Sequence, residues 1–147
     1  MSRFVRPQTT VLPLGNGDTI TIKSRLSAGE QRDAYARMYL AGIDGKLHAN
    51  PLQSGLGMIT AYLLDWNLTD DGEPVPIRGL SVAELESVLN SLEPESFTEI
   101  KQAIEAHEVR MAEARAAEKK SRAGVTGADP TSPSLSAAAG ELIGSAT

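Results

Sequence analysis

The chain of 147 residues is 41% hydrophobic with a formal net charge of −5, and its length predicts one globular domain, with or without a tail. It has no cysteine, which excludes disulfides, thiolate nucleophiles and cysteine-based zinc sites and fits a reducing compartment. Residues 48–108 carry two Lys or Arg against eleven acids, for −9, and such an acidic middle disfavours nucleic acid, whose affinity comes chiefly from neutralised phosphates.

No segment resembles a signal peptide or a membrane span. The first ten residues, MSRFVRPQTT, lack an apolar core, and the longest apolar run, Met58 to Leu64, is interrupted by Thr60 and ended by Asp65. A membrane span needs about 20 apolar residues. We therefore expect a soluble protein that is located in the cytoplasm and does not contact a membrane.

Two runs near the N-terminus predict a β-hairpin. Thr9 to Leu14 and Thr19 to Lys23 are rich in β-branched residues, and the second run alternates polar and apolar side chains. Asn16-Gly17 between them is typical of a tight turn with positive φ, and Pro13 places the first strand at an edge. The glycines of this turn lack the third glycine and the following helix of a phosphate-binding loop.

The first helix is predicted to begin after Ser27 and to end at about Leu40 or Gly42. Ser27 and Glu30 form the Ser-x-x-Glu pattern of a capping box, in which each side chain bonds the backbone of the other residue. A glycine-rich run ends the helix. Lys46 to Pro51 is then expected to be a connection to the next helix.

The second helix is predicted from Pro51 or Leu52 through Trp66. Its large apolar residues repeat at spacings of four, three, four and three, which places them along one stripe of a helix. They are Leu52, Leu56, Ile59, Leu63 and Trp66. We expect this helix to be the centre of the core. Tyr62 and Trp66 also lie four apart, as in a binding box, but core packing is favoured because the same stripe carries leucines.

An acidic turn follows, with four carboxylates within nine residues: Asp65, Asp70, Asp71 and Glu73. The segment is too short and too rigid for a calcium loop, which alternates oxygen ligands over twelve residues. A tight Asp-Gly turn followed by an extended Pro-x-Pro segment explains it better. We predict no metal site, no cofactor and no catalytic set of residues.

Two more helices are predicted in the second half of the chain. Ser81 and Glu84 form another capping box and open a short helix, which ends before Pro94. Apolar spacings from Phe97 onward then indicate an amphipathic helix that reaches about Lys120, roughly 40 Å long. Large apolar residues stop at Met111, so we expect the last turns to project from the domain.

The sequence therefore predicts a mainly α fold with an N-terminal β-hairpin, a small α+β domain of about four helices with the last one long and projecting. From Ala123 to Thr147, 19 of 25 residues are Ala, Gly, Ser, Thr or Pro, too few large side chains to form a core. We divide the chain into a flexible N-terminus, residues 1–8, a helical domain, residues 9–121, and a disordered tail, residues 122–147.

The order of these elements resembles that of the tail assembly chaperones of long-tailed, siphovirus-like bacteriophages, over about residues 5–120. Four motifs carry the resemblance: the turn Gly15-Asn16-Gly17-Asp18; the helix start Arg25-Leu26-Ser27-Ala28-Gly29-Glu30; Ala61-Tyr62-Leu63-Leu64-Asp65-Trp66 with Asp71-Gly72-Glu73-Pro74-Val75-Pro76 after it; and Leu92-Glu93-Pro94-Glu95-Ser96-Phe97 before the long helix.

The resemblance implies a non-enzymatic factor that binds and solubilises the tape measure protein in the host cell cytoplasm. It also implies that the factor helps to recruit tail tube protein and is absent from the mature virion. Programmed ribosomal frameshifting would yield a longer form of the chain, which would be a further partner. Whether the chain forms a homo-oligomer stays open.

Five apolar residues are the candidates for client binding, because a helical client is recognised by an apolar groove. They are Leu63, Trp66, Phe97, Ile100 and Ile104. The same residues could equally be core. A different class also stays open, a structural virion protein such as a connector or tail-completion subunit. An enzyme is disfavoured because no nucleophile-base pair occurs, and a DNA-binding repressor because the helices are neutral to acidic.

Overall fold

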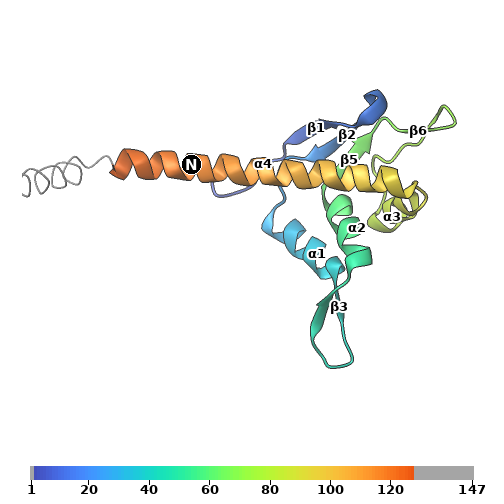
Figure 1. Cartoon of the computed structure of the whole chain (residues 1–147), viewed down its shortest axis with the longest axis horizontal. Coiled ribbons are helices and arrows are strands. Elements are labelled where there is room, and N and C mark those ends of the chain that lie inside the picture. Colours follow the sequence, from blue (N-terminus) through green and yellow to red (C-terminus); the bar gives the residue numbers. More distant parts are fainter. Residues whose placement is uncertain (1, 128–147) are drawn as a thin grey trace, which may run out of the picture. The chain divides into compact units, whose positions relative to one another are not determined.

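The computed structural model contains a three-stranded antiparallel sheet (Figure 1). It describes residues 2–127, apart from the side chains of Pro51, Leu52 and residues 123–127. Strands β1 (Thr9–Pro13) and β2 (Thr19–Lys23) form the predicted N-terminal hairpin. Asn16 in its turn has a φ of 60°, a positive value that an Asn-Gly turn requires. The strand order β1-β2-β5 leaves β1 at an edge, as Pro13 predicts.

Strand β5 (Leu63–Trp66) corrects the prediction of a helix through Trp66. Helix α2 (Pro51–Tyr62) ends at Tyr62, and the strand that follows it pairs antiparallel with β2 through Leu63, Asp65 and Trp66, with a register shift at Leu64. The spacing of Leu63 and Trp66 fits both a helix and a short strand. Tertiary pairing decides for the strand, because the second edge of β2 would otherwise leave backbone N–H and C=O groups without partners.

A second hairpin replaces the predicted end of the first helix. Helix α1 (Ala28–Met38) stops at Met38, and strand β3 (Tyr39–Ala41) pairs antiparallel with β4 (Leu47–Ala49). The helix therefore ends before the predicted Leu40 or Gly42, and the predicted connection from Lys46 contains strand β4. The glycine-rich run closes a turn instead, in which the N–H of Gly42 donates to the carbonyl of Lys46 at 2.8 Å.

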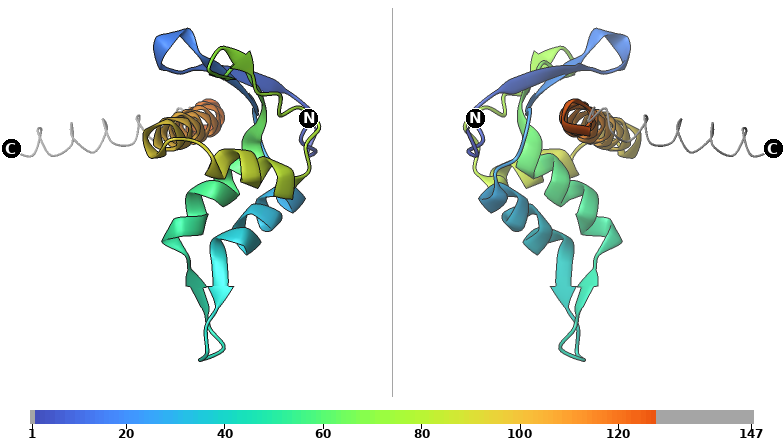
Figure 2. Two further views of the ribbon diagram at one scale, coloured as in Figure 1. Left: turned by 90° about the vertical axis from the view of Figure 1, so that its right-hand side faces the viewer. Right: turned by 90° about the vertical axis from the view of Figure 1, so that its left-hand side faces the viewer.

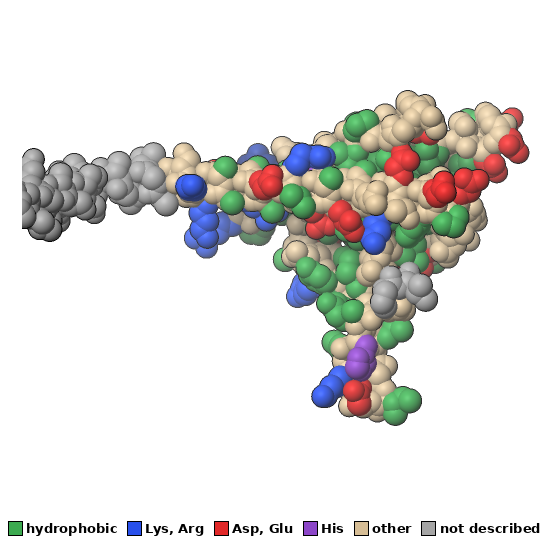
Figure 3. All heavy atoms as spheres, viewed as in Figure 1, with side chains coloured by type: hydrophobic (Ala, Val, Ile, Leu, Met, Phe, Trp, Pro, Cys, Tyr) green, Lys and Arg blue, Asp and Glu red, His purple; other side chains and the backbone are tan. Residues whose placement is uncertain are grey.

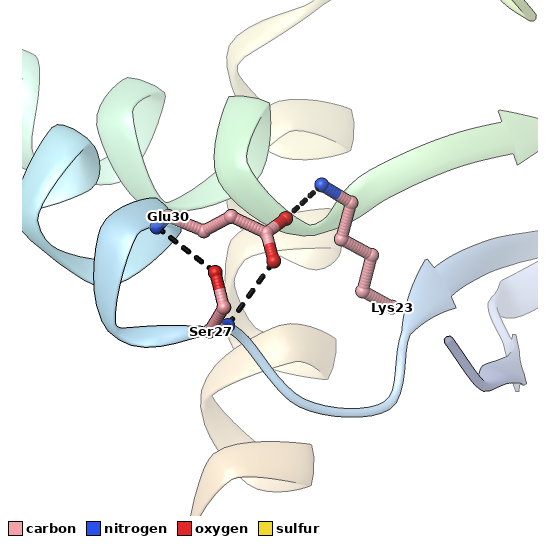
Figure 4. Close-up of polar contacts among 3 residues, drawn as sticks. All are labelled: Lys23, Ser27 and Glu30. Carbon is pink, nitrogen blue, oxygen red and sulfur yellow. Dashed lines mark hydrogen bonds and ion pairs between the residues drawn. The ribbon is translucent and has the colours of Figure 1, made fainter. Parts of the chain in front are cut away.

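Both predicted capping boxes are confirmed. Ser27 Oγ accepts from the Glu30 N–H at 3.2 Å, and Glu30 Oε1 accepts from the Ser27 N–H at 3.1 Å (Figure 4). Ser81 and Glu84 exchange the same pair of bonds, at 3.2 and 3.4 Å, at the start of α3 (Val82–Asn90). These local bonds satisfy backbone groups that a helix start leaves open.

The hydrophobic core joins the sheet to α2, α3 and the first turns of α4 (Pro94–Gly127). Its fully buried side chains are Ile20, Ile22, Ile59, Leu89, Ile100 and Ile104. His107 is buried with them, with Nε2 2.8 Å from the carbonyl oxygen of Ser24 and its ring edge-on to Tyr62. A buried histidine with a bonded ring nitrogen is part of the core.

Helices α1 and α2 pack closely against each other, and Figure 2 shows them side by side with the β3–β4 hairpin at their far ends. Gly57 on α2 allows this approach. A Cβ atom at Gly57 would lie 3.2 Å from Met38 Cγ and 3.3 Å from the carbonyl oxygen of Ala34. The hairpin is thereby attached at both ends to a tightly packed helix pair.

Helix α4 continues past Lys120 to Gly127, and the remainder of the predicted tail, residues 128–147, lies outside the described residues. The chain divides into two compact units, one ending at His107 and one beginning at Glu108. In the second unit the side chains from Glu108 to Arg122 are exposed, except for the partly buried Met111. None of the helices that the structure describes is long and apolar enough to cross a membrane.

Candidate interaction surfaces

The five residues predicted to bind a client lie in different environments. Ile100 and Ile104 are fully buried and Leu63 is 5% exposed, so these three side chains fill the core. Trp66 and Phe97 are only partly buried, packed against the core. Phe97 lies beside α2, where its Cε1 atom would be 3.3 Å from a Cβ atom at Gly55. Of the five side chains, only those of Trp66 and Phe97 are more than slightly exposed.

The β3–β4 hairpin carries an exposed apolar face that the sequence did not reveal. In the ladder Tyr39 lies opposite Ala49, and Ala41 lies opposite Leu47. Directly opposed residues share a face and strand residues alternate between faces, so these four residues lie on one face. We call Tyr39, Ala41, Leu47 and Ala49 the apolar hairpin face. All four are exposed, Leu47 to 71%.

Further apolar surface adjoins this face. Leu40, on the opposite side of the hairpin, is 56% exposed, and Ile43 in the turn is fully exposed. No third strand pairs with β3 or β4 among residues 2–127. Exposed apolar residues that cluster on one element are typical of interaction sites, whereas single scattered ones are not. The hairpin is therefore a candidate docking element.

The hairpin turn is held by polar contacts around Asp44. Asp44 Oδ1 lies 3.1 Å from His48 Nε2 and accepts from the Lys46 N–H at 3.1 Å. The His48 contact is the first cause, and the Lys46 N–H the second, of a lowered pKa for the Asp44 carboxyl. A Cβ atom at Gly42 would lie 2.7 Å from Asp44 Oδ1, so a larger residue there would displace the Asp44 and His48 side chains from their present contact.

A groove lies elsewhere in the first compact unit, between β5, the hairpin of β6 (Thr69–Asp70) and β7 (Glu73–Pro74), α3 and the start of α4. Its volume is about 370 Å³, and its apolar lining consists of Trp66, Leu68, Val75, Val88 and Leu92. Its lining also includes the hydroxyls of Thr69, Ser91 and Ser96 and the carboxylates of Asp70 and Glu93, and we call it the acid-rimmed groove after these two exposed carboxylates. Figure 3 shows Asp and Glu side chains gathered over β6 and the first part of α4.

The indole of Trp66 is fixed in this groove by a hydrogen bond from Nε1 to the carbonyl oxygen of Val75 at 2.7 Å. A second, smaller depression of about 210 Å³ adjoins the groove, because the two share Leu68, Thr69, Leu92 and Ser96. It adds two more carboxylates, those of Asp18 and Glu99. No lysine or arginine lines either depression.

The acidic turn that forms part of the rim has the predicted tight geometry. Strand β6 (Thr69–Asp70) pairs with β7 (Glu73–Pro74), and Asp71 and Gly72 between them have φ values of 47° and 82°. Positive φ at both central residues is the pattern of a hairpin turn. Within the described part of the chain, no group of three or more His, Asp or Glu side chains is placed to hold a metal ion.

The groove was missed because its lining comes from separate segments. Leu68, Val75, Val88 and Leu92 have no common spacing in the sequence, and only the tertiary fold brings them beside Trp66. The apolar hairpin face was missed for a different reason. The residues Tyr39 and Leu47 were assigned to a helix end and a connection, so their pairing could not be foreseen.

Comparisons of the chain with protein-family models, with curated proteins and with solved structures gave no match in any of the three.

Proposed function

We propose that this chain is a tail assembly chaperone of a siphovirus-like bacteriophage. In this role it binds the tape measure protein in the host cell cytoplasm, keeps it soluble and helps to recruit tail tube protein, without catalysing a reaction and without remaining in the virion. The sequence motifs described above support the family assignment. The single observation that carries the role is the exposed apolar hairpin face.

A chaperone of this kind needs an apolar surface that is accessible before the client arrives. The hairpin offers such an apolar surface, and its side chains are not part of the core, since every residue of β3 and β4 is exposed. Tyr39 suits such a surface because its ring is apolar while its hydroxyl remains hydrated. The side chains of Leu63, Ile100 and Ile104 support the fold instead, and we assign the client contact to the hairpin.

The magnitude of this contact favours a multivalent complex. Burial of Leu47 and Ile43 would contribute about 2 kcal/mol each, whereas association costs at least about 4 kcal/mol in lost freedom of motion. One hairpin therefore binds weakly. Several hairpins bind a long client far more tightly when their chains are also joined to one another, because each bound site then raises the local concentration at the next.

The test is co-expression with the candidate tape measure protein of the same genome, scored by the soluble fraction of the client and by co-purification. We expect a soluble complex with the unaltered chain. The double variant Ile43→Ser and Leu47→Ser should lose it, because the apolar surface of the hairpin becomes polar. Val11→Ser with Val109→Ser is the matched control, since these residues are also exposed, 60% and 55%, but lie outside the hairpin.

Circular dichroism would establish that both double variants are folded. A client that stays insoluble with the unaltered chain would reject the chaperone role. So would stoichiometric amounts of the chain in purified particles, which would favour a connector or tail-completion subunit instead.

A further inference from the structure

The acid-rimmed groove has an apolar floor that the fold leaves open. Trp66, Leu68, Val88 and Leu92 pack against the core on one side and remain partly exposed on the other. The only polar atom of the Trp66 side chain, Nε1, already donates to the carbonyl of Val75. The accessible part of this indole therefore offers apolar surface, and a partner gains most by covering it with apolar side chains.

The border of the groove has one sign of charge. Asp70 and Glu93 border the groove itself, and Asp18 and Glu99 border the adjoining depression. None of the ion pairs between described residues involves any of these four carboxylates. Glu99 accepts a backbone hydrogen bond from Gly15 at 2.6 Å, which holds its carboxylate in place without neutralising it.

We propose that the acid-rimmed groove binds a cationic amphipathic helix of the client, with large apolar side chains on the groove floor and Lys or Arg side chains against the rim. The groove accommodates side chains and not a whole helix, so the helix would lie across it and insert residues spaced by three or four. That the helix belongs to a client rests on the function proposed above.

A second copy of this chain is the other source of a cationic helix. Residues 108–122 hold five Lys or Arg against three Glu, and Figure 3 shows basic side chains on this part of α4. Its large apolar side chains are only Val109 and Met111. Two such residues cannot cover a floor built from five apolar side chains, so we assign the groove to a client helix with a fuller apolar stripe.

The test uses Trp66, the only tryptophan of the chain, as a reporter within the groove. The probes are two synthetic helical peptides of about 18 residues, five turns, with one leucine stripe and either Lys or Glu on the flanks. We expect the Leu/Lys peptide to shift the emission of Trp66 in a saturable way. Binding of the Leu/Glu peptide should be at least about ten-fold weaker, and salt should weaken the Leu/Lys complex.

Two double variants distinguish the effect of the groove carboxylates on binding from the effect of the net charge of the chain. Asp70→Asn with Glu93→Gln should weaken binding of the Leu/Lys peptide by about three-fold or more. Glu113→Gln with Glu118→Gln removes the same charge from exposed positions of the second compact unit and should leave the affinity unchanged. Thermal unfolding of both variants would establish that they fold alike.

Three results would overturn the inference: equal binding of the two peptides, equal weakening by the two pairs of substitutions, or a peptide of residues 108–122 that binds as tightly as the Leu/Lys peptide. The last result would assign the groove to a second copy. The client experiment is independent of this test. A chain that solubilises the client but ignores the Leu/Lys peptide would remove the groove inference and leave the chaperone role intact.

Discussion

At the scale of single residues, Glu30 connects the sheet to the first helix. One carboxylate oxygen accepts the Ser27 N–H of the capping box, and the other pairs with Lys23 Nζ at the end of β2 (Figure 4). The bond from Lys23 is the largest cause of a pKa for Glu30 below its ordinary value of 4.5, and partial burial opposes it. The ionised carboxylate is thus stabilised in the folded chain.

This lowered pKa predicts a pH dependence of stability. A depressed pKa contributes stability that is present above pH 4.5 and is lost as the pH falls through the lower folded value. Glu30→Gln should lower the free energy of unfolding by about 0.5 kcal/mol at pH 7, the worth of a partly exposed ion pair. The difference should shrink as the pH falls through the lowered folded pKa of Glu30, because the glutamate then also becomes neutral. Urea unfolding at pH 7 and at a series of lower pH values measures it.

Ser27→Ala provides the contrast for this measurement. It removes the hydroxyl that accepts the Glu30 N–H, so it should cost about 1 kcal/mol. The Ser27 side chain is only a minor cause of the lowered Glu30 pKa, so most of this loss should persist at acid pH. A Glu30→Gln deficit that stayed undiminished down to the lowest pH of the series would mean that the Lys23 pair is not its cause.

At the scale of elements, the β3–β4 hairpin is separable from the fold. Its ladder begins with Tyr39 opposite Ala49, so the two strands are already side by side at the base of the hairpin. Between Tyr39 and Ala49, only Gly42 is partly buried, and every other residue is exposed. The hairpin therefore contributes surface, while the packing of α1 against α2 is independent of it.

Replacement of Leu40–His48 by Asn-Gly tests this separation. The dipeptide forms a two-residue turn that can join Tyr39 to Ala49. We expect the free energy of unfolding to change by less than about 0.5 kcal/mol, because no buried side chain is removed. Solubilisation of the tape measure protein should be lost. Chemical denaturation and the co-expression assay measure the two effects, and a shortened chain that still solubilised the client would place the client contact elsewhere.

At the scale of the whole molecule, the burial of side chains changes along the chain. Among the side chains that the structure describes, the buried ones all lie at or before His107, and those from Ala112 to Arg122 are exposed. The sequence from Ala123 onward has few large apolar residues to add to a core. Stability is therefore concentrated in the first compact unit.

A chain that stops after Ala114 should fold as the full chain does. It keeps Met111 and one further helical turn, and it loses no buried side chain among those described. We expect the free energy of unfolding to fall by less than about 1 kcal/mol. Thermal and urea unfolding of the two chains measure the difference, and a larger loss would mean that residues beyond Ala114 contribute to the core.

The sequence by itself determined the features that depend on neighbours in the chain. The Asn16-Gly17 turn, the capping boxes and the acidic turn are local, since each is made by residues a few positions apart, and all were predictable. Only the tertiary structure decided that Leu63–Trp66 is a strand, because the free edge of β2 outweighs a helical spacing. Only the tertiary structure also decided the two candidate surfaces. The pairing of β3 with β4 places the apolar hairpin face on one side of the hairpin, and the packing of distant segments forms the acid-rimmed groove.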